Sequence, residues 1–133
     1  LDAAIALCTP VAQRFTDYPN VFYVLARIHS KKGDHQKAIA ALTQGLAGSP
    51  TSTRLLLALA HVYTVTQQYE SALGAYQTIV KNNGSIEALH YIGVLYHKYL
   101  GNGKKAKEYY TRYVKAGGSN PDAKRALSEL DKL

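Results

Sequence analysis

Cysteine, methionine and long apolar runs are scarce or missing in this sequence. Its one cysteine, Cys8, cannot form an internal disulfide, and we expect it to pack in a hydrophobic core. No stretch approaches the roughly 18 apolar residues of a membrane span, so we expect a soluble protein. The composition leaves the compartment open between cytoplasm and periplasm.

Motifs that would indicate an enzyme are also missing. The sequence has no glycine-rich phosphate loop, no serine nucleophile motif and no paired carboxylates in one register. Five histidines occur, but His90 and His97 are seven residues apart, whereas two ligands that share an ion on one helix face stand four apart. We therefore predict neither catalysis nor a bound cofactor or metal.

An internal repeat runs through the chain. Alanine recurs at one constant interval, the repeat interval, at Ala4, Ala38, Ala72 and Ala106. The next position keeps the same phase, with Ile5, Ile39 and Leu73. A period of about 34 residues with two amphipathic helical segments is typical of a unit that buries its apolar faces only by stacking on its neighbours. The sequence therefore predicts an all-α solenoid of stacked antiparallel helix hairpins.

The second interval shows the pattern most fully. It carries Leu56, Leu59, Ala60, Tyr63, Ala72 and Tyr76. These residues resemble the tetratricopeptide repeat (TPR), whose pattern is W-x2-L-G-x2-Y followed by A-x3-F and P. The resemblance implies a right-handed superhelix in which the first helix of each hairpin lines a concave groove that holds a peptide or partner protein.

We expect one TPR domain over residues 1–133. Residues 1–18 form the second helix of an incomplete repeat, 19–52, 53–85 and 86–118 form three repeats, and 119–133 form a capping helix. Pro10 predicts a kink or a helix restarted with Thr9 as its cap, and Asp34 and Ser85 are expected caps. The third repeat begins one residue early, so we place a compensating extra residue in the turn Tyr99–Gly103. Asn83–Ser85 also matches an N-glycosylation acceptor, but without evidence of secretion we expect a plain turn there.

The expected groove residues follow from the phase of the first helices. They are Asn20, Tyr23, Arg27, Arg54, Leu57, Ala58, His61, His90, Tyr91 and Val94. This set mixes apolar side chains with donors, which suits an extended or helical peptide of acidic character. The clamp with which some family members grip chaperone tails is absent, because its lysine and asparagine positions carry residues such as Tyr23 and Ala58.

Two other hypotheses remain open. The chain begins with Leu1 in mid-pattern, so we expect a piece of a longer protein or one whose signal peptide is removed. The unpaired first helix could then dock on another copy and make the protein a self-associating scaffold. Residues 98–133 hold nine basic residues against four acids, and with eleven tyrosines in the chain they raise the third hypothesis, nucleic-acid binding. The tyrosine phase argues against it, because several tyrosines occupy the family's packing positions.

Overall fold

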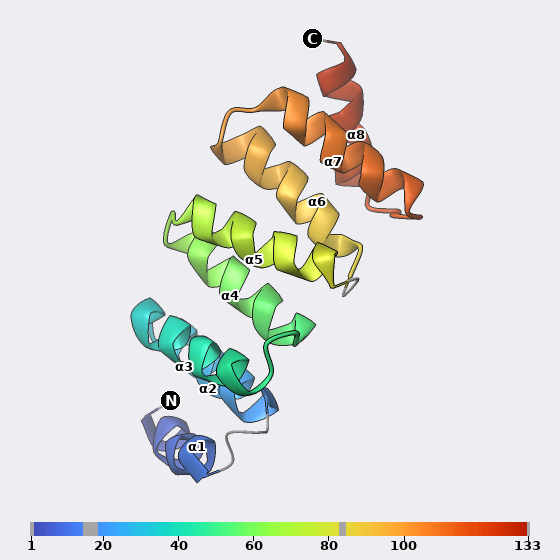
Figure 1. Ribbon diagram of the computed structural model, residues 1–133. Helices are drawn as coiled ribbons and strands as arrows, with labels where there is room; N and C mark the ends of the chain where they lie inside the picture. The colour runs from blue at the N-terminus through green and yellow to red at the C-terminus, as the bar shows by residue number, and fades with distance from the viewer. Residues whose placement is uncertain (1, 15–18, 83–84, 133) are drawn as a thin grey trace. The chain divides into compact units, whose positions relative to one another are not determined.

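The computed structural model describes residues 2–14, 19–82 and 85–132 (Figure 1). These ranges contain eight α-helices and one π-helical turn, and no strand. The elements are α1 (Asp2–Arg14), α2 (Pro19–Lys31), α3 (His35–Gly48), α4 (Thr53–Val65), α5 (Tyr69–Lys81), α6 (Glu87–Val94), η1 (Leu95–Tyr99), α7 (Gly103–Lys115) and α8 (Pro121–Asp131). They fall into two compact units, Leu1–Ala75 and Tyr76–Leu133. The proposed division into one domain with three repeats stays a prediction.

The core of the first unit lies between α2, α3 and α4. Phe22, Leu42 and Leu55 are fully buried there, because each stands on the apolar stripe of its own helix. Gly45 lets α3 approach α2, since a Cβ on Gly45 would lie 2.8 Å from the Cβ of Phe22. Cys8 of α1 packs against this cluster, as predicted, and an ion pair between Asp2 and Lys32 also joins α1 to the end of α2.

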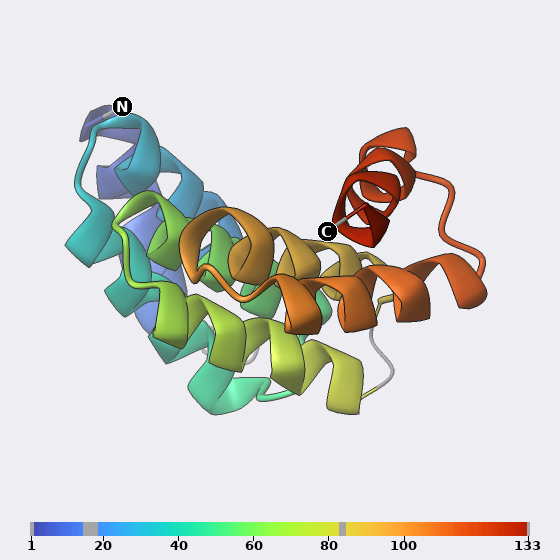
Figure 2. The same cartoon turned by 90° about the horizontal axis from the view of Figure 1, so that it is seen from above.

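The second unit packs α6, α7 and α8 around buried tyrosines. The hydroxyl of Tyr113 donates to the Glu87 carboxylate, with an O···O distance of 3.4 Å, and accepts from the backbone N–H of Asn120 at 3.1 Å. One side chain of α7 thereby contacts the start of α6 and the start of α8. Ala123 and Leu130 turn the apolar face of α8 toward α7, and Figure 2 shows the two helices side by side.

The three hairpin turns share one geometry. In each turn, a residue with positive φ comes first. The carbonyl of the residue directly after it accepts the first backbone hydrogen bond of the next helix. The positive-φ residues are Gly33 (82°), Gln67 (64°) and Gly101 (64°), and they precede Asp34, Gln68 and Asn102. Because the turn is the same in all three hairpins, the third turn is not lengthened.

The extra residue of the third hairpin lies instead in the helix before the turn. The backbone N–H of Asp34 bonds to His29 and that of Gln68 to Tyr63, each five residues back. The matching bond in the third hairpin, from Asn102 to Tyr96, spans six residues. The additional residue is taken up by η1, where Leu100 donates to Leu95 in the wider π pattern. Our placement in the turn was therefore wrong, because a π turn accepts an insertion while keeping every backbone bond.

Two predicted caps also differ from the structure. Helix α1 continues through Pro10, and the Thr9 hydroxyl donates back to the Ile5 carbonyl at 2.8 Å, so the helix does not restart. Asp34 stands at the N-cap of α3 but its side chain accepts no cap bond. The Ser85 hydroxyl does accept from the N–H of Glu87 at 3.2 Å. The expected turn at 15–18 and the Asn83–Gly84 part of the glycosylation acceptor lie outside the described residues.

Candidate functional site

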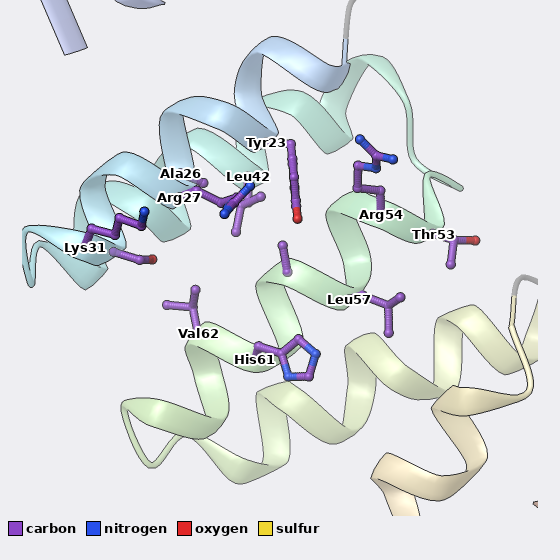
Figure 3. Close-up of a pocket in the computed structure, with 12 residues that line it drawn as sticks. Tyr23, Ala26, Arg27, Lys31, Leu42, Thr53, Arg54, Leu57, His61 and Val62 are labelled. Atoms are coloured by element: carbon purple, nitrogen blue, oxygen red, sulfur yellow. The ribbon is translucent and has the colours of Figure 1, made fainter. Parts of the chain in front are cut away.

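A pocket of about 670 Å³ opens between α2 and α4 in the first unit, with Leu42 of α3 at its floor (Figure 3). Its lining residues are Tyr23, Ala26, Arg27, Ser30, Lys31, Leu42, Thr53, Arg54, Leu57, Ala58, His61 and Val62. Each element contributes side chains from one helical face, because residues three or four apart on a helix lie side by side. The pocket has the size of a cleft that holds a few peptide side chains or a small ligand.

Tyr23 stands between two arginines at one end of this pocket. The guanidinium carbon of Arg54 lies 5.1 Å from the centroid of the Tyr23 ring, and that of Arg27 lies 5.8 Å from it. Both distances are within the range of cation–π attraction. Arg54 also donates to the side-chain oxygen of Asn20 at 3.4 Å. The ring and the amide hold the two guanidinium groups near the pocket before any ligand arrives.

The charge of the lining is of one sign. Arg27, Lys31 and Arg54 are cationic, and none of the twelve lining residues is a carboxylate. The floor beneath these cations is apolar, formed mainly by Leu42, Ala58 and neighbouring aliphatic groups. Such a pocket favours an anionic group beside an apolar one and disfavours a cationic ligand.

His61 contributes a neutral polar group to the pocket. Burial lowers the pKa of its imidazole below the ordinary value of 6.5, so the ring is predominantly uncharged at neutral pH. In Figure 3 its ring lies between Val62 and Leu57 on α4. A neutral imidazole adds no positive charge to the pocket.

Six of the ten residues expected in a groove line this pocket, and a seventh, Asn20, adjoins it through Arg54. The other three, His90, Tyr91 and Val94, stand on α6 in the second unit. His90 is only 8% exposed and lies among the rings of Tyr91, Tyr110 and Tyr113, so it does not offer a free side chain to a partner. The ring of Tyr91 stacks on that of Tyr76 at 5.3 Å. The role of the whole set in partner binding stays a prediction.

Lys31 lines the pocket but was not among the expected residues. The signal was present in the sequence, because Lys31 follows Arg27 by four residues and therefore shares its helical face.

Most tyrosines that could have been free for base stacking are engaged. Tyr113 is buried, and Tyr109 stacks on Tyr96 with ring centroids 5.8 Å apart. Arg112 lies over the Tyr109 ring and Lys105 over the Tyr96 ring, at 5.0 and 5.9 Å. These rings already pair with the protein's own rings and cations, which leaves fewer of them for base stacking.

None of the described helices combines the length and apolar character that crossing a bilayer requires. Over the same residues, no three His, Cys, Asp or Glu side chains gather closely enough to hold a metal ion.

Comparison with solved structures shows the same fold in several proteins. A crystal structure of MamA protein superposes with a TM-score of 0.82 at 19% identity, over 98% of this chain and 72% of that one. YrrB, described as a TPR protein with an unusual peptide-binding site, gives 0.76 at 16% identity, over 92% and 63%. The first TPR of Spaghetti (RPAP3), bound to an HSP90 peptide, gives 0.75 at 21% identity, over 86% and 90%. The predicted all-helical solenoid of antiparallel hairpins is therefore confirmed.

Comparison at the level of sequence adds the family. No curated protein matches the sequence. Two profiles described as tetratricopeptide repeat match residues 29–92 and 87–116, which together run from the end of α2 to the end of α7. The chain belongs to the tetratricopeptide repeat family.

Proposed function

We propose that this protein is an interaction module that binds a segment of a partner protein in the pocket between α2 and α4. The observation that carries the proposal is the pocket itself, an open cleft of about 670 Å³ with an apolar floor and a cationic rim. Two proteins of the same fold support it, since YrrB is described with a peptide-binding site and the RPAP3 domain with a bound HSP90 peptide.

The partner segment that fits is acidic, with at least one apolar side chain. Carboxylates pair with guanidinium groups through two parallel hydrogen bonds, and such pairs are stronger than neutral ones. Arg54 is already held by Asn20 and Tyr23, so little side-chain entropy is lost when it binds. The apolar side chain of the ligand would lie on Leu42 and Ala58 at the floor.

A peptide display selection on the wild-type protein tests the proposal. We expect the recovered peptides to be rich in Asp and Glu around an apolar residue. Their affinity, measured by fluorescence anisotropy, should fall by roughly tenfold or more for Arg54→Ala, since hot-spot arginines contribute about 2 kcal/mol. Lys37→Ala is the matched control, because Lys37 is an exposed cation of the same unit that does not line the pocket. Equal binding to wild type and to an Arg27→Ala, Arg54→Ala double variant would refute this choice of face.

A second candidate function, self-association through α1, is favoured by one observation. Leu7 of α1 is 75% exposed, the highest value for a large apolar side chain in the described part of the protein. Together with the exposed Ala3, Ala6 and Pro10 it forms an apolar surface of the kind that marks association sites.

A further inference from the structure

The two arginines of the pocket stand on opposite faces of one ring. The guanidinium carbon of Arg27 lies 5.8 Å from the centroid of the Tyr23 ring, and that of Arg54 lies 5.1 Å from it. In Figure 3 the two side chains reach the ring from either side, Arg27 from α2 and Arg54 from α4. The ring therefore fills the space between the two charges and keeps them apart.

This arrangement prevents one carboxylate from serving both arginines. Taken together, the two distances allow the guanidinium carbons to lie up to about 11 Å apart. A carboxylate held by two parallel hydrogen bonds has its carbon only about 4 Å from the guanidinium carbon. A single carboxylate shared by Arg27 and Arg54 would have to lie where the Tyr23 ring lies. Each guanidinium group can therefore take a carboxylate of its own.

Neither charge is neutralised within the described part of the protein. Arg27 and Arg54 are exposed, and among the described residues no carboxylate pairs with either of them. Arg54 donates to the side-chain oxygen of Asn20, a neutral group, at 3.4 Å. Two like charges held at one ring repel each other, and two anions relieve that repulsion more completely than one.

We propose that Tyr23 is a spacer that makes the pocket select two acidic side chains, one for Arg27 and one for Arg54. The inference rests on the proposed function, binding of an acidic segment in this pocket, and goes beyond it by giving the number and the spacing of the acids. Tyr23 is a positioning residue here, because it sets the distance between the two groups that contact the ligand.

An extended segment meets this spacing with two acids that flank one residue. Side chains alternate along a strand, so residues i and i+2 point to the same side with about 6.6 Å between them. Two glutamates at these positions can reach outward to guanidinium groups that stand further apart. Adjacent acids point to opposite sides and bring only one carboxylate to the pocket. The next residue on the same side would lie on the apolar floor, at Leu42 and Ala58.

The same geometry disfavours the end of a chain as the ligand. The two carboxylates of a C-terminal aspartate are joined by three single bonds of about 1.5 Å, which place their carbons no more than about 4 Å apart. They cannot reach around the Tyr23 ring to both arginines. We therefore expect internal acids to be selected, and amidation of the C-terminus of the ligand to leave binding unchanged.

Fluorescence anisotropy with a symmetric, C-terminally amidated peptide, Leu-Ala-Glu-Ala-Glu-Ala-Leu, tests the spacing. The symmetry makes the result independent of the direction in which the segment lies. Replacing either glutamate by glutamine should weaken binding roughly tenfold, because one charge-assisted pair is lost. The isomer with adjacent glutamates, Leu-Ala-Glu-Glu-Ala-Ala-Leu, should bind no better than a peptide with one glutamate. The free acid of the spaced peptide should bind like the amide.

Variants of Tyr23 test the spacer itself. Tyr23→Leu removes the ring and lets the arginines approach one carboxylate, so the preference for the spaced peptide over its isomer should fall from roughly tenfold to about twofold or less. Tyr23→Phe keeps the ring and should keep the preference. Lys31→Ala is the matched control, because Lys31 is a cation of the lining about two turns beyond Tyr23 on α2. It should weaken both peptides by the same factor, as would a purely structural effect.

A second measurement covers the case in which circular dichroism shows that Tyr23→Leu does not fold. In Arg27→Ala only one arginine remains at the ring, so the second glutamate should become dispensable and the peptides with one and two glutamates should bind equally. A second glutamate that still strengthens binding to Arg27→Ala roughly tenfold would overturn the pairing of one acid with each arginine.

The outcomes separate this inference from the function on which it rests. Equal affinity for the spaced peptide and its isomer, or an unchanged preference in Tyr23→Leu, overturns the spacer. Binding in the pocket then still stands if Arg54→Ala weakens it. Failure of all these peptides to bind, or binding that Arg54→Ala leaves unchanged, overturns the proposed function and the spacer together.

Discussion

Gln67 and Gly101 share a φ of 64°, each directly before the residue that begins the next helix, although only one of them is glycine. The left-handed conformation is strained for residues that carry a Cβ, and glycine adopts it without that cost. The second hairpin therefore contains a strain that the first and third avoid.

Replacing Gln67 by glycine should stabilise the protein. The strain of a left-handed non-glycine residue exceeds the extra chain entropy of glycine, so we expect a gain of roughly 0.5–1 kcal/mol in the free energy of unfolding. Chemical denaturation followed by circular dichroism measures it. Gln68→Gly is the control, since Gln68 does not have positive φ, and it should stabilise nothing. Equal effects of the two variants would contradict the strain argument.

The contact between Gly93 and Tyr110 gives a second prediction. Gly93→Ala would put a methyl group 2.8 Å from the ring, and the overpacking should cost about 1–3 kcal/mol of stability. Adding Tyr110→Leu should recover part of the loss, because the double variant then has the alanine and leucine that the first hairpin has at the same positions, Ala26 and Leu42. Gly74→Ala is the control, because a Cβ there meets no atom within 4 Å and alanine favours the helix by about 0.5–1 kcal/mol. Thermal denaturation compares these variants with the wild type.

The π turn η1 gives a third prediction, on the effect of deleting one residue. Deletion of Lys98, an exposed residue, should convert the six-residue span between Tyr96 and Asn102 to the five-residue span of the other hairpins. We expect a folded protein with an ordinary α-helix up to the turn and no loss of melting temperature. Deletion of Thr64, at the corresponding place in α4, removes a residue that is not surplus and should destabilise the protein, because it shifts the turn and the start of α5 by one residue relative to α4. A protein unfolded by the Lys98 deletion would show that η1 is required.

The register of the repeat predicted the hairpins well because buried side chains recur with it. Cys8, which we expected in a hydrophobic core, packs against the buried cluster of the first unit. The repeat interval also shows that the third hairpin holds one extra residue. It does not show where that residue lies, because a π turn and a longer loop shift the phase of the following helix equally.

The candidate site was predicted less completely. Phase placed Tyr23, Arg27 and Arg54 on one side, and the structure brings them together around one ring. His90 has the same kind of phase, yet it is covered by rings from α7. Which exposed position a neighbouring helix covers depends on the sizes of side chains far away in the sequence, and no local pattern contains that information.

Acid should weaken the second unit through His90. Burial lowers the pKa of its imidazole from 6.5, although the Glu87 and Asp122 carboxylates oppose the shift. Below that ordinary value the unfolded chain takes up a proton that the folded protein resists. His90 therefore lowers the free energy of unfolding in acid relative to neutral pH. We expect the free energy of unfolding to fall as the pH decreases from about 7.5 to about 5.5. Urea denaturation at both pH values measures the loss, and His90→Gln should reduce it. An unchanged pH dependence in that variant would exclude His90 as its source.

The common turn of the three hairpins has a consequence for how such a chain can change in length. Each turn sets the direction of the second helix of its hairpin with the same backbone conformation, so a duplicated hairpin would inherit a turn of the same geometry. Duplication of one complete repeat would extend the array without redesigning its contacts, whereas an insertion of any other size needs a local device such as η1 to restore the phase.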